Sequence, residues 1–218
     1  LNAAMFDLDR VEVLKGPQGT LYGRNATAGS VNIIAKKPTH SREINVGASY
    51  GNYNYLKLNG SVNLPLGKIA AIRVAGMLDK HDGFRNGGDL VGRVDNGNLI
   101  ALRAGIDVNP TKNLNIYLVG EMNKTDQQAP SQYGVRLIGL PGLNGTIPSS
   151  FTTDLPRDFP LASAGFMKID QKAVRTKISY NLGSASITYT GAYRVVDLDG
   201  YQSLNGFVPE TFAFHNDL

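Results

Sequence analysis

The feature that most constrains this chain is a two-residue alternation of apolar and polar side chains, repeated in seven segments. Because successive side chains of a β-strand point to opposite faces of a sheet, this period predicts a strand in each segment. No stretch has the 18 or more consecutive apolar residues of a transmembrane helix. The sequence therefore predicts an all-β fold. The seven segments are residues 44–50, 56–64, 72–79, 100–108, 114–123, 174–182 and 187–195.

The charged residues of these segments keep almost entirely to the polar face. Only Lys80 and Asp197 fall on the apolar face, and both lie at strand ends. A lysine or arginine that faces lipid at mid-bilayer costs roughly 2–4 kcal/mol, falling to about 0–1 kcal/mol near the interfaces. The pattern is typical of a membrane β-barrel with a polar lumen, although a soluble sandwich would also segregate its charges. The predicted lumen-facing charges are Lys57, Arg73, Arg103, Asp107, Glu121, Arg175, Lys177 and Arg194.

The lengths of the connections favour the barrel over the sandwich. The connections at residues 65–68, 109–113 and 183–184 are short, whereas the alternate ones at 81–98 and 126–172 are long. Among the alternate connections only the first, residues 51–54, is brief. Short turns on one rim and long extracellular loops on the other are typical of outer-membrane barrels. The sequence thus predicts a partial antiparallel barrel of about seven strands, with no strand at the C-terminal end.

Composition and the scarcity of reactive side chains narrow the function. The chain is 42% hydrophobic, so it is too apolar to be disordered, and without cysteine it has no disulfide or thiolate metal site. Its net charge of +4 is spread along the sequence, without the basic stripe of a nucleic-acid interface. One histidine between two acids could suggest a metal site, but we interpret these residues as part of a polar loop. They are Asp79, His81 and Asp82. We expect no enzyme, no cofactor and no metal site.

A different pattern occupies residues 9–38. Two short apolar runs, residues 11–14 and 31–35, flank a glycine-rich stretch. A P-loop would need Gly-Lys-Ser/Thr and a dinucleotide site would need G-x-G-x-x-G, and neither is present. The glycines therefore predict tight turns with positive φ. The turn residues are Gly16, Pro17, Gly19, Gly23 and Gly29.

Residues 9–38 resemble the closing segment of the plug domain of TonB-dependent outer-membrane receptors. That family carries Arg-Val/Ile-Glu-Val, a Gly-Pro-x-Gly turn, Leu-Tyr-Gly, and Val-Asn-Ile-Ile before a basic pair and a proline, as this sequence does in one register. The resemblance implies the C-terminal end of a plug at residues 1–40 and the start of a barrel of about 22 strands at residues 41–218. It also implies an internal fragment that lacks the rest of the plug, the TonB box and most of the barrel.

The resemblance further implies roles for particular residues. Plug arginines and glutamates of this family pair with each other and with carboxylates of the barrel wall, so Arg10, Glu12 and Arg24 are candidates for a latch. Removing one member of a buried pair is strongly destabilising, which suits that role, although a solvated strand edge would also hold these residues. Loops on rigid scaffolds tend to carry recognition. The candidate ligand contacts of the 126–172 loop are Tyr133, Arg136, Phe151, Arg157 and Phe159.

The implied function is active uptake of a scarce ligand across the outer membrane of a Gram-negative bacterium. The ligand of this family is most often a ferric siderophore, and sometimes cobalamin or an oligosaccharide. The implied partners are outer-membrane lipid and the TonB–ExbB–ExbD complex, which acts through the TonB box, with no nucleic acid. A passive outer-membrane barrel and a soluble β-sandwich binding module remain as alternatives.

Overall fold

The computed structural model describes residues 5–17, 29–86, 92–128, 165–203 and 211–217, and in these ranges it consists of strands and turns. No helix with the length and apolarity needed to cross a membrane occurs in the described residues. The strands are β1 (Leu8–Lys15), β2 (Gly29–Ala35), β3 (Glu43–Gly51), β4 (Tyr55–Leu66), β5 (Ala70–His81), β6 (Arg85–Asn86), β7 (Arg93–Val94), β8 (Gly97–Thr111), β9 (Leu114–Gln128), β10 (Phe166–Asn181), β11 (Ser186–Ser203) and β12 (Thr211–Asp217).

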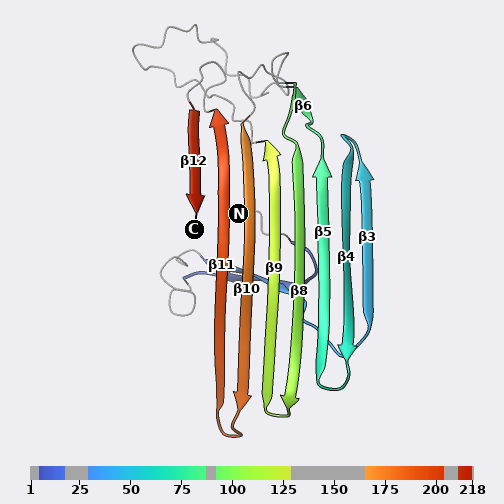
Figure 1. Ribbon diagram of the computed structural model, residues 1–218, viewed down its shortest axis with the longest axis vertical. Helices are drawn as coiled ribbons and strands as arrows, with labels where there is room; N and C mark the ends of the chain where they lie inside the picture. Colours follow the sequence, from blue (N-terminus) through green and yellow to red (C-terminus); the bar gives the residue numbers. More distant parts are fainter. Residues whose placement is uncertain (1–4, 18–28, 87–91, 129–164, 204–210, 218) are drawn as a thin grey trace.

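Eight of these strands form one large antiparallel sheet. Their order is β12-β11-β10-β9-β8-β5-β4-β3, so apart from the short β6–β7 hairpin each strand pairs with its neighbour in sequence. Figure 1 shows this meander face-on, with the short turns of β4–β5, β8–β9 and β10–β11 together at the lower end. The predicted all-β fold with a partial antiparallel barrel is confirmed.

Two details of the sequence prediction are wrong, namely a missing strand and the bounds of a loop. The chain does carry a strand near its C-terminal end, because β12 pairs with β11 from Ser203↔Thr211 to Asp197↔Asp217. The predicted loop at 126–172 is also too long, since residues 126–128 and 166–172 belong to β9 and β10. Residues 168–172 place Lys168, Asp170 and Lys172 where apolar side chains would continue the alternation. The backbone nevertheless keeps pairing in register.

The two faces of the large sheet differ sharply in exposure. Val46 and Tyr193, both on the apolar face, are 84% and 72% exposed. Ala75 and Ala101 on the polar face are 2% and 0% exposed. Hydrophobic side chains therefore point away from the rest of the protein, as on the lipid-facing side of a membrane barrel.

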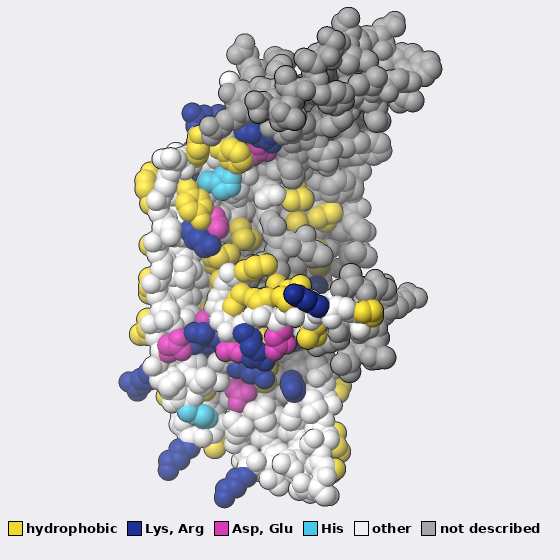
Figure 2. Space-filling view, turned by 180° about the vertical axis from the view of Figure 1, so that it is seen from behind, with side chains coloured by type: hydrophobic (Ala, Val, Ile, Leu, Met, Phe, Trp, Pro, Cys, Tyr) yellow, Lys and Arg dark blue, Asp and Glu magenta, His cyan; other side chains and the backbone are white. Residues whose placement is uncertain are grey.

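The chain beside the small sheet contributes to the burial on the polar face, since Phe6, just before β1, packs with Ala75 and Ala101. β1 and β2 pair antiparallel, with Val11 opposite Ile33, and they cross behind the large sheet at a steep angle to its strands (Figure 1). Seen from behind, charged side chains of both signs gather across the middle of this face (Figure 2). Polar and charged groups therefore lie beside the small sheet on this face of the large sheet.

Candidate functional site at the junction of the two sheets

Arg73 of β5 is the centre of the junction. Its Nε and Nη2 donate to Oδ2 and Oδ1 of Asp7, at 2.7 and 2.5 Å, and its Nη1 donates to Glu43 Oε2 at 3.1 Å. The Ser61 hydroxyl accepts a further bond from Nη2 at 3.0 Å. The Arg73 side chain is 3% exposed and that of Asp7 is 8% exposed. A two-pronged, largely dehydrated pair of this kind combines strength with a fixed geometry.

The position of Asp7 follows from the chain just before β1. Asp7 has a φ of 50°, a left-handed conformation that aspartate tolerates better than most residues. Its carbonyl accepts a hydrogen bond from the backbone N–H of Lys36 at 3.0 Å, which joins the start of β1 to the end of β2. Asp7 is thereby fixed at the end of the small sheet where β1 begins and β2 ends.

Phe6 supplies an apolar contact beside the ion pair. Its side chain is buried in a cluster with Ala75, Met77 and Ala101 of the large sheet. The Arg103 guanidinium lies 4.7 Å from the centroid of the Phe6 ring, and Arg103 Nη1 donates to the Phe6 carbonyl at 3.1 Å. Arg103 thus makes both a cation–π contact and a hydrogen bond to Phe6, in the segment just before β1.

Glu121 extends the charge network along the large sheet, which we also call the wall. Its Oε1 accepts from Arg103 Nε at 2.6 Å and from Arg175 Nη2 at 2.8 Å. Since Arg103 and Glu121 are directly opposite each other across β8 and β9, the pair is a cross-strand contact on one face. The network holds the Arg103 guanidinium in the orientation that reaches Phe6.

The connection between the two sheets is fastened separately, by Asn63 of β4. The Asn63 side chain accepts from the Thr39 backbone N–H at 3.0 Å and donates to the Thr39 carbonyl at 2.8 Å and to the Ser41 carbonyl. Asn63 is 0% exposed. Lys36 also pairs with Glu43 at 3.4 Å, and Lys37 Nζ lies 5.2 Å from the centroid of the Tyr117 ring. Residues 36–43 are therefore bonded to the wall at several points.

The residues predicted as a latch lie elsewhere in the structure. Arg10 pairs with Glu12 at 2.7 Å and with Asp9, all three on β1 and all substantially exposed. Hydrogen bonds to Glu12 and Asp9 raise the pKa of the Arg10 guanidinium. Arg24 is outside the described residues. No ion pair joins Arg10 or Glu12 to the large sheet among the residues that the structure describes, so their latch role stays a prediction.

The predicted turn residues fall partly outside the described ranges as well. Gly16 has a φ of 85°, and Gly29 has a φ of 142° with its hypothetical Cβ only 2.4 Å from the Leu14 carbonyl oxygen. Both positions therefore need glycine. Pro17 follows Gly16, whereas Gly19 and Gly23 lie outside the described residues.

The eight charges predicted to face the lumen all lie on the face that carries the small sheet, although only some of them touch it. Arg73 and Arg103 reach the small sheet or its approach, and Lys57 pairs with Asp79 at 3.7 Å along the wall. Asp107 accepts from Asn109 and Asn115. By strand register, Lys177 lies opposite Tyr117 and Arg194 opposite Ala173, a residue buried on this face. Their role in lining a lumen stays a prediction.

Sequence reasoning missed four residues of the junction, namely Phe6, Asp7, Glu43 and Asn63. Their signals were present but weak, since Phe6-Asp7 directly precedes the strand pattern and Asn63 occupies the polar face of its segment. The predicted ligand-capture residues, from Tyr133 to Phe159, are outside the described residues. No group of three or more His, Cys, Asp or Glu side chains that could hold a metal is found within the described ranges.

Comparison with known proteins is consistent with this architecture. Residues 2–30 match the family model of the TonB-dependent receptor plug domain. The catecholate siderophore receptor Fiu of Escherichia coli (strain K12) is 34% identical over 151 residues, which cover 69% of this chain and 18% of that receptor. The metal-pseudopaline receptor CntO of Pseudomonas aeruginosa is 34% identical over 84 residues, which cover 38% of this chain and 12% of the receptor.

Solved structures share the fold. The ferric-catecholate import receptor Fiu from E. coli K12, in its closed form, superposes with a TM-score of 0.74 at 22% identity, over 98% of this chain and 32% of that chain. The ferric yersiniabactin uptake receptor FyuA from Yersinia pestis gives a TM-score of 0.74 at 15% identity, over 89% and 29%. The chain thus spans less than a third of the length of these receptors, and it belongs to the TonB-dependent receptor family.

Proposed function

We propose that the receptor containing this chain imports a ferric siderophore across the outer membrane of a Gram-negative bacterium, with energy delivered through TonB. The relatives support a metal-chelate ligand, because Fiu is named a catecholate siderophore receptor and CntO a metal-pseudopaline receptor. Among siderophores, the similarity to Fiu favours a catecholate. Uptake of cobalamin or an oligosaccharide by the same mechanism is the alternative.

The observation that carries the proposal is the way the two sheets meet. Apolar side chains such as Val46 are exposed on the outer face, while a separate two-stranded sheet is bound to the inner face through Asp7 and Arg73. A passive barrel has no need of such an inner sheet, and a soluble sandwich would bury the apolar face rather than the charged one. A plugged membrane barrel accounts for both features.

In this proposal residues 1–40 are the end of the plug and residues 41–218 are the beginning of the barrel. The TonB–ExbB–ExbD complex pulls on a TonB box elsewhere in the receptor, and the plug rearranges so that the ligand passes. The Asp7–Arg73 pair and the bonds of Asn63 to the connection resist this pull at the C-terminal end of the plug. The ligand is moved without covalent change, so the receptor is a transporter and not an enzyme.

Recognition of the ligand takes place on the side of the long connections, which would face the exterior. The proposed contacts, all outside the described residues, remain Tyr133, Arg136, Phe151, Arg157 and Phe159. Arg10, Glu12 and Arg24 remain the proposed latch residues, which would help to hold the plug in the lumen. Outer-membrane lipid would cover the exposed apolar face.

The proposal is tested by iron uptake in cells that carry the full receptor gene as their only siderophore receptor. Uptake of radiolabelled ferric siderophore is expected in cells with TonB and to be absent in matched cells without it. Uptake that persists without TonB would indicate a passive barrel. If the cells took up cobalamin or a glycan and no siderophore, the siderophore assignment would be wrong, and that molecule would be the ligand. Recovery of the receptor in the soluble fraction without detergent would contradict the membrane assignment.

A further inference from the structure

A row of lysines marks the outward, apolar face of the large sheet at the end opposite the short turns. On three strands, the first charged outward residue encountered on moving away from the short turn is a lysine. These residues are Lys80 of β5, Lys124 of β9 and Lys172 of β10, and we call them the lysine row. All three are exposed. Among the described residues, Lys80 and Lys124 form no ion pair, and Lys172 forms only a long one with Asp170, at 3.7 Å.

The lysine row runs obliquely to the strands. Lys172 lies opposite Met122, the last apolar outward residue of β9 before Lys124. Lys124 in turn lies opposite Ile100 of β8, where the next outward residue is the polar Asn98. Strands of a membrane barrel tilt by about 35–45°, so a flat membrane boundary crosses successive strands at shifting register positions. The row therefore follows the edge of the apolar band.

Acidic side chains of this face lie further out than the lysines on the same strands. Asp126 of β9 and Asp170 of β10 each come one outward position beyond the lysine of their strand. On β11 the first charged outward residue is Asp197, so the lysine row ends at β10. On β9 and β10 the positive charges are thus nearest to the apolar band. This order favours an anionic layer directly above the hydrocarbon.

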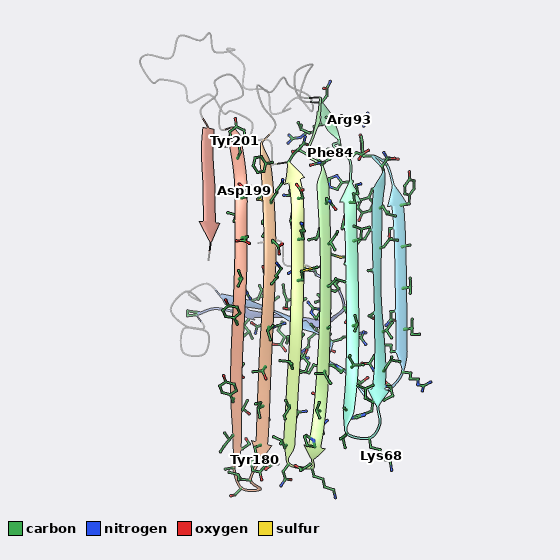
Figure 3. The ribbon with its side chains drawn as sticks, viewed as in Figure 1. Lys68, Phe84, Arg93, Tyr180, Asp199 and Tyr201 are labelled. Atoms are coloured by element: carbon green, nitrogen blue, oxygen red, sulfur yellow. The ribbon has the colours of Figure 1, made fainter. Side chains whose placement is uncertain are left out.

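The other end of the same face carries no comparable row. Figure 3 shows Lys68 and Tyr180 at this end, with Asp199 and Tyr201 at the end of the lysine row. Lys68 lies in the β4–β5 turn itself. Lysine extends its ammonium group to any membrane interface, and that tendency would act at both ends. The one-sided row therefore indicates that the anionic layer lies on the side of the long connections. The outward strand residues nearest the short turns on β4, β5, β9, β10 and β11 are Leu66, Ala70, Leu114, Tyr180 and Ile187.

Exposed aromatic rings continue this face well beyond the lysine row. Phe166 lies six residues beyond Lys172 on β10, and its ring stacks with that of Tyr201 at a centroid distance of 6.4 Å. Lys168 Nζ lies 5.6 Å from the centroid of the Phe166 ring. At about 3.3 Å per residue and a tilt of 35–45°, six residues rise by about 14–16 Å along the membrane normal.

This height decides between two kinds of lipid headgroup. The polar layer of a phospholipid leaflet is about 5–8 Å thick. The Phe166 ring, 37% exposed, would therefore stand in water beside a phospholipid. A glycolipid is thicker, because its sugars extend outward from the phosphates, and the apolar faces of sugar rings can pack on aromatic side chains.

We propose that the lysine row and the Phe166–Tyr201 pair form a docking surface for a phosphorylated glycolipid of the outer leaflet, a lipopolysaccharide. Its phosphates would accept charge-assisted hydrogen bonds from the lysines, and its sugars would contact the two rings. The surface is continuous with the exposed apolar face, so acyl chains of the same molecule would pack beside Leu118 and Val174. The inference rests on the proposed placement in the outer membrane, and it goes beyond siderophore import because it uses no group of the import route.

The test uses the purified full receptor in detergent, titrated with a lipopolysaccharide that carries a short core oligosaccharide and, separately, with phosphatidylglycerol. Binding is measured by native mass spectrometry. The triple variant Lys80→Gln, Lys124→Gln, Lys172→Gln should weaken lipopolysaccharide binding at least tenfold, since one lysine at an anionic lipid surface contributes about fivefold. Replacing the same three lysines by arginine should keep the affinity within about twofold, because the charges remain. Phe166→Ala should weaken binding by about threefold, the loss of one aromatic contact.

Lys68→Gln is the matched control, because Lys68 is equally exposed but lies in a turn at the other end of the sheet. Its affinity for lipopolysaccharide should stay within about twofold of the wild type, less than one lysine at the surface contributes. Equal affinities for the wild type and the triple glutamine variant would overturn the inference and leave siderophore import, measured separately by iron uptake, intact. Phosphatidylglycerol bound as tightly as lipopolysaccharide would overturn the glycolipid assignment. An unchanged affinity in Phe166→Ala would overturn the contact between the rings and the sugars.

Discussion

Arg10 and Arg73 are both arginines paired with two carboxylates, yet their surroundings differ in almost every respect. The partners of Arg10 are Asp9 and Glu12, its neighbours on β1, and the Arg10 side chain is 56% exposed. The main partner of Arg73 is Asp7, 66 residues away in sequence, and the Arg73 side chain is 3% exposed. The Arg10 cluster makes contacts only along its own strand, whereas the Arg73 cluster joins the two sheets.

The difference in exposure indicates which contacts hold the small sheet against the large one. Exposed pairs contribute little to stability because water competes for both charges. A buried pair is different, since removal of one partner leaves an uncompensated charge without water. Of these two clusters, only the one around Arg73 can therefore resist the separation of the sheets.

The largest effect is expected from Arg73→Ala. The substitution leaves Asp7 buried without its cation, so the free energy of local opening of residues 5–10 should fall by about 3–5 kcal/mol. Hydrogen–deuterium exchange of the full receptor measures this opening directly. Arg175→Ala is the control, because Arg175 is also bonded to a wall carboxylate but is 46% exposed, and it should change the opening free energy by only about 0–1 kcal/mol. Equal losses of opening free energy for the two variants would show that burial of the arginine does not decide how strongly it holds the small sheet.

Asp7→Asn should have a smaller effect than Arg73→Ala. The amide oxygen still accepts a hydrogen bond from Arg73, and Arg73 keeps Glu43 as a charged partner. Loss of the charge-assisted bond should lower the same opening free energy by about 2 kcal/mol. The same exchange measurement applies. A loss as large as that of Arg73→Ala would show that Glu43 contributes nothing to the site.

Asn63→Ala should act on the connection rather than on the start of β1. The variant removes the side chain that bonds Thr39 and Ser41, leaving partly buried backbone groups without a partner. Exchange protection of residues 38–42 should fall by about 1–2 kcal/mol, while residues 5–10 keep theirs. If both segments lost protection together, the connection and the Asp7 contact would form a single cooperative unit.

Arg10→Gln should have the smallest effect. Its partners lie on its own strand and are exposed, so we expect no measurable change in exchange at residues 5–10 and no change in siderophore uptake. This variant decides between the two clusters. If Arg10→Gln lowered the opening free energy as much as Arg73→Ala does, Arg10 and Glu12 would be the latch residues, as the resemblance to the plug domain implies.

Sequence patterns predicted most of the large sheet because each strand has an apolar outer face through its middle. They failed at the ends of strands, where Lys168, Asp170 and Lys172 on the outer face of β10 break the alternation although backbone pairing continues. The strand β12 was missed for a related reason, because its pairing with β11 rather than a long alternating pattern defines it.

The junction was only half predictable. Arg73 stood out as a charge in mid-strand, but nothing local marks Asp7 as its partner, because the contact arises only when the small sheet crosses the wall. Asn63 likewise looks like any polar-face residue, and its bonds to Thr39 and Ser41 depend on the path of the connection. Contacts between residues distant in sequence cannot be read from the periodicity of either strand.

We expect the apolar face of the large sheet to meet lipid while its polar face encloses the small sheet. Single nitroxide labels on cysteines introduced along β5 of the full receptor in lipid bilayers test it most directly, by collision with dissolved oxygen. Labels at Ile72, Val74 and Leu78 should be oxygen-accessible, and labels at Ala71 and Ala75, both almost fully buried, should be protected. The reverse pattern, or accessibility without a two-residue period, would show that the apolar face does not meet lipid.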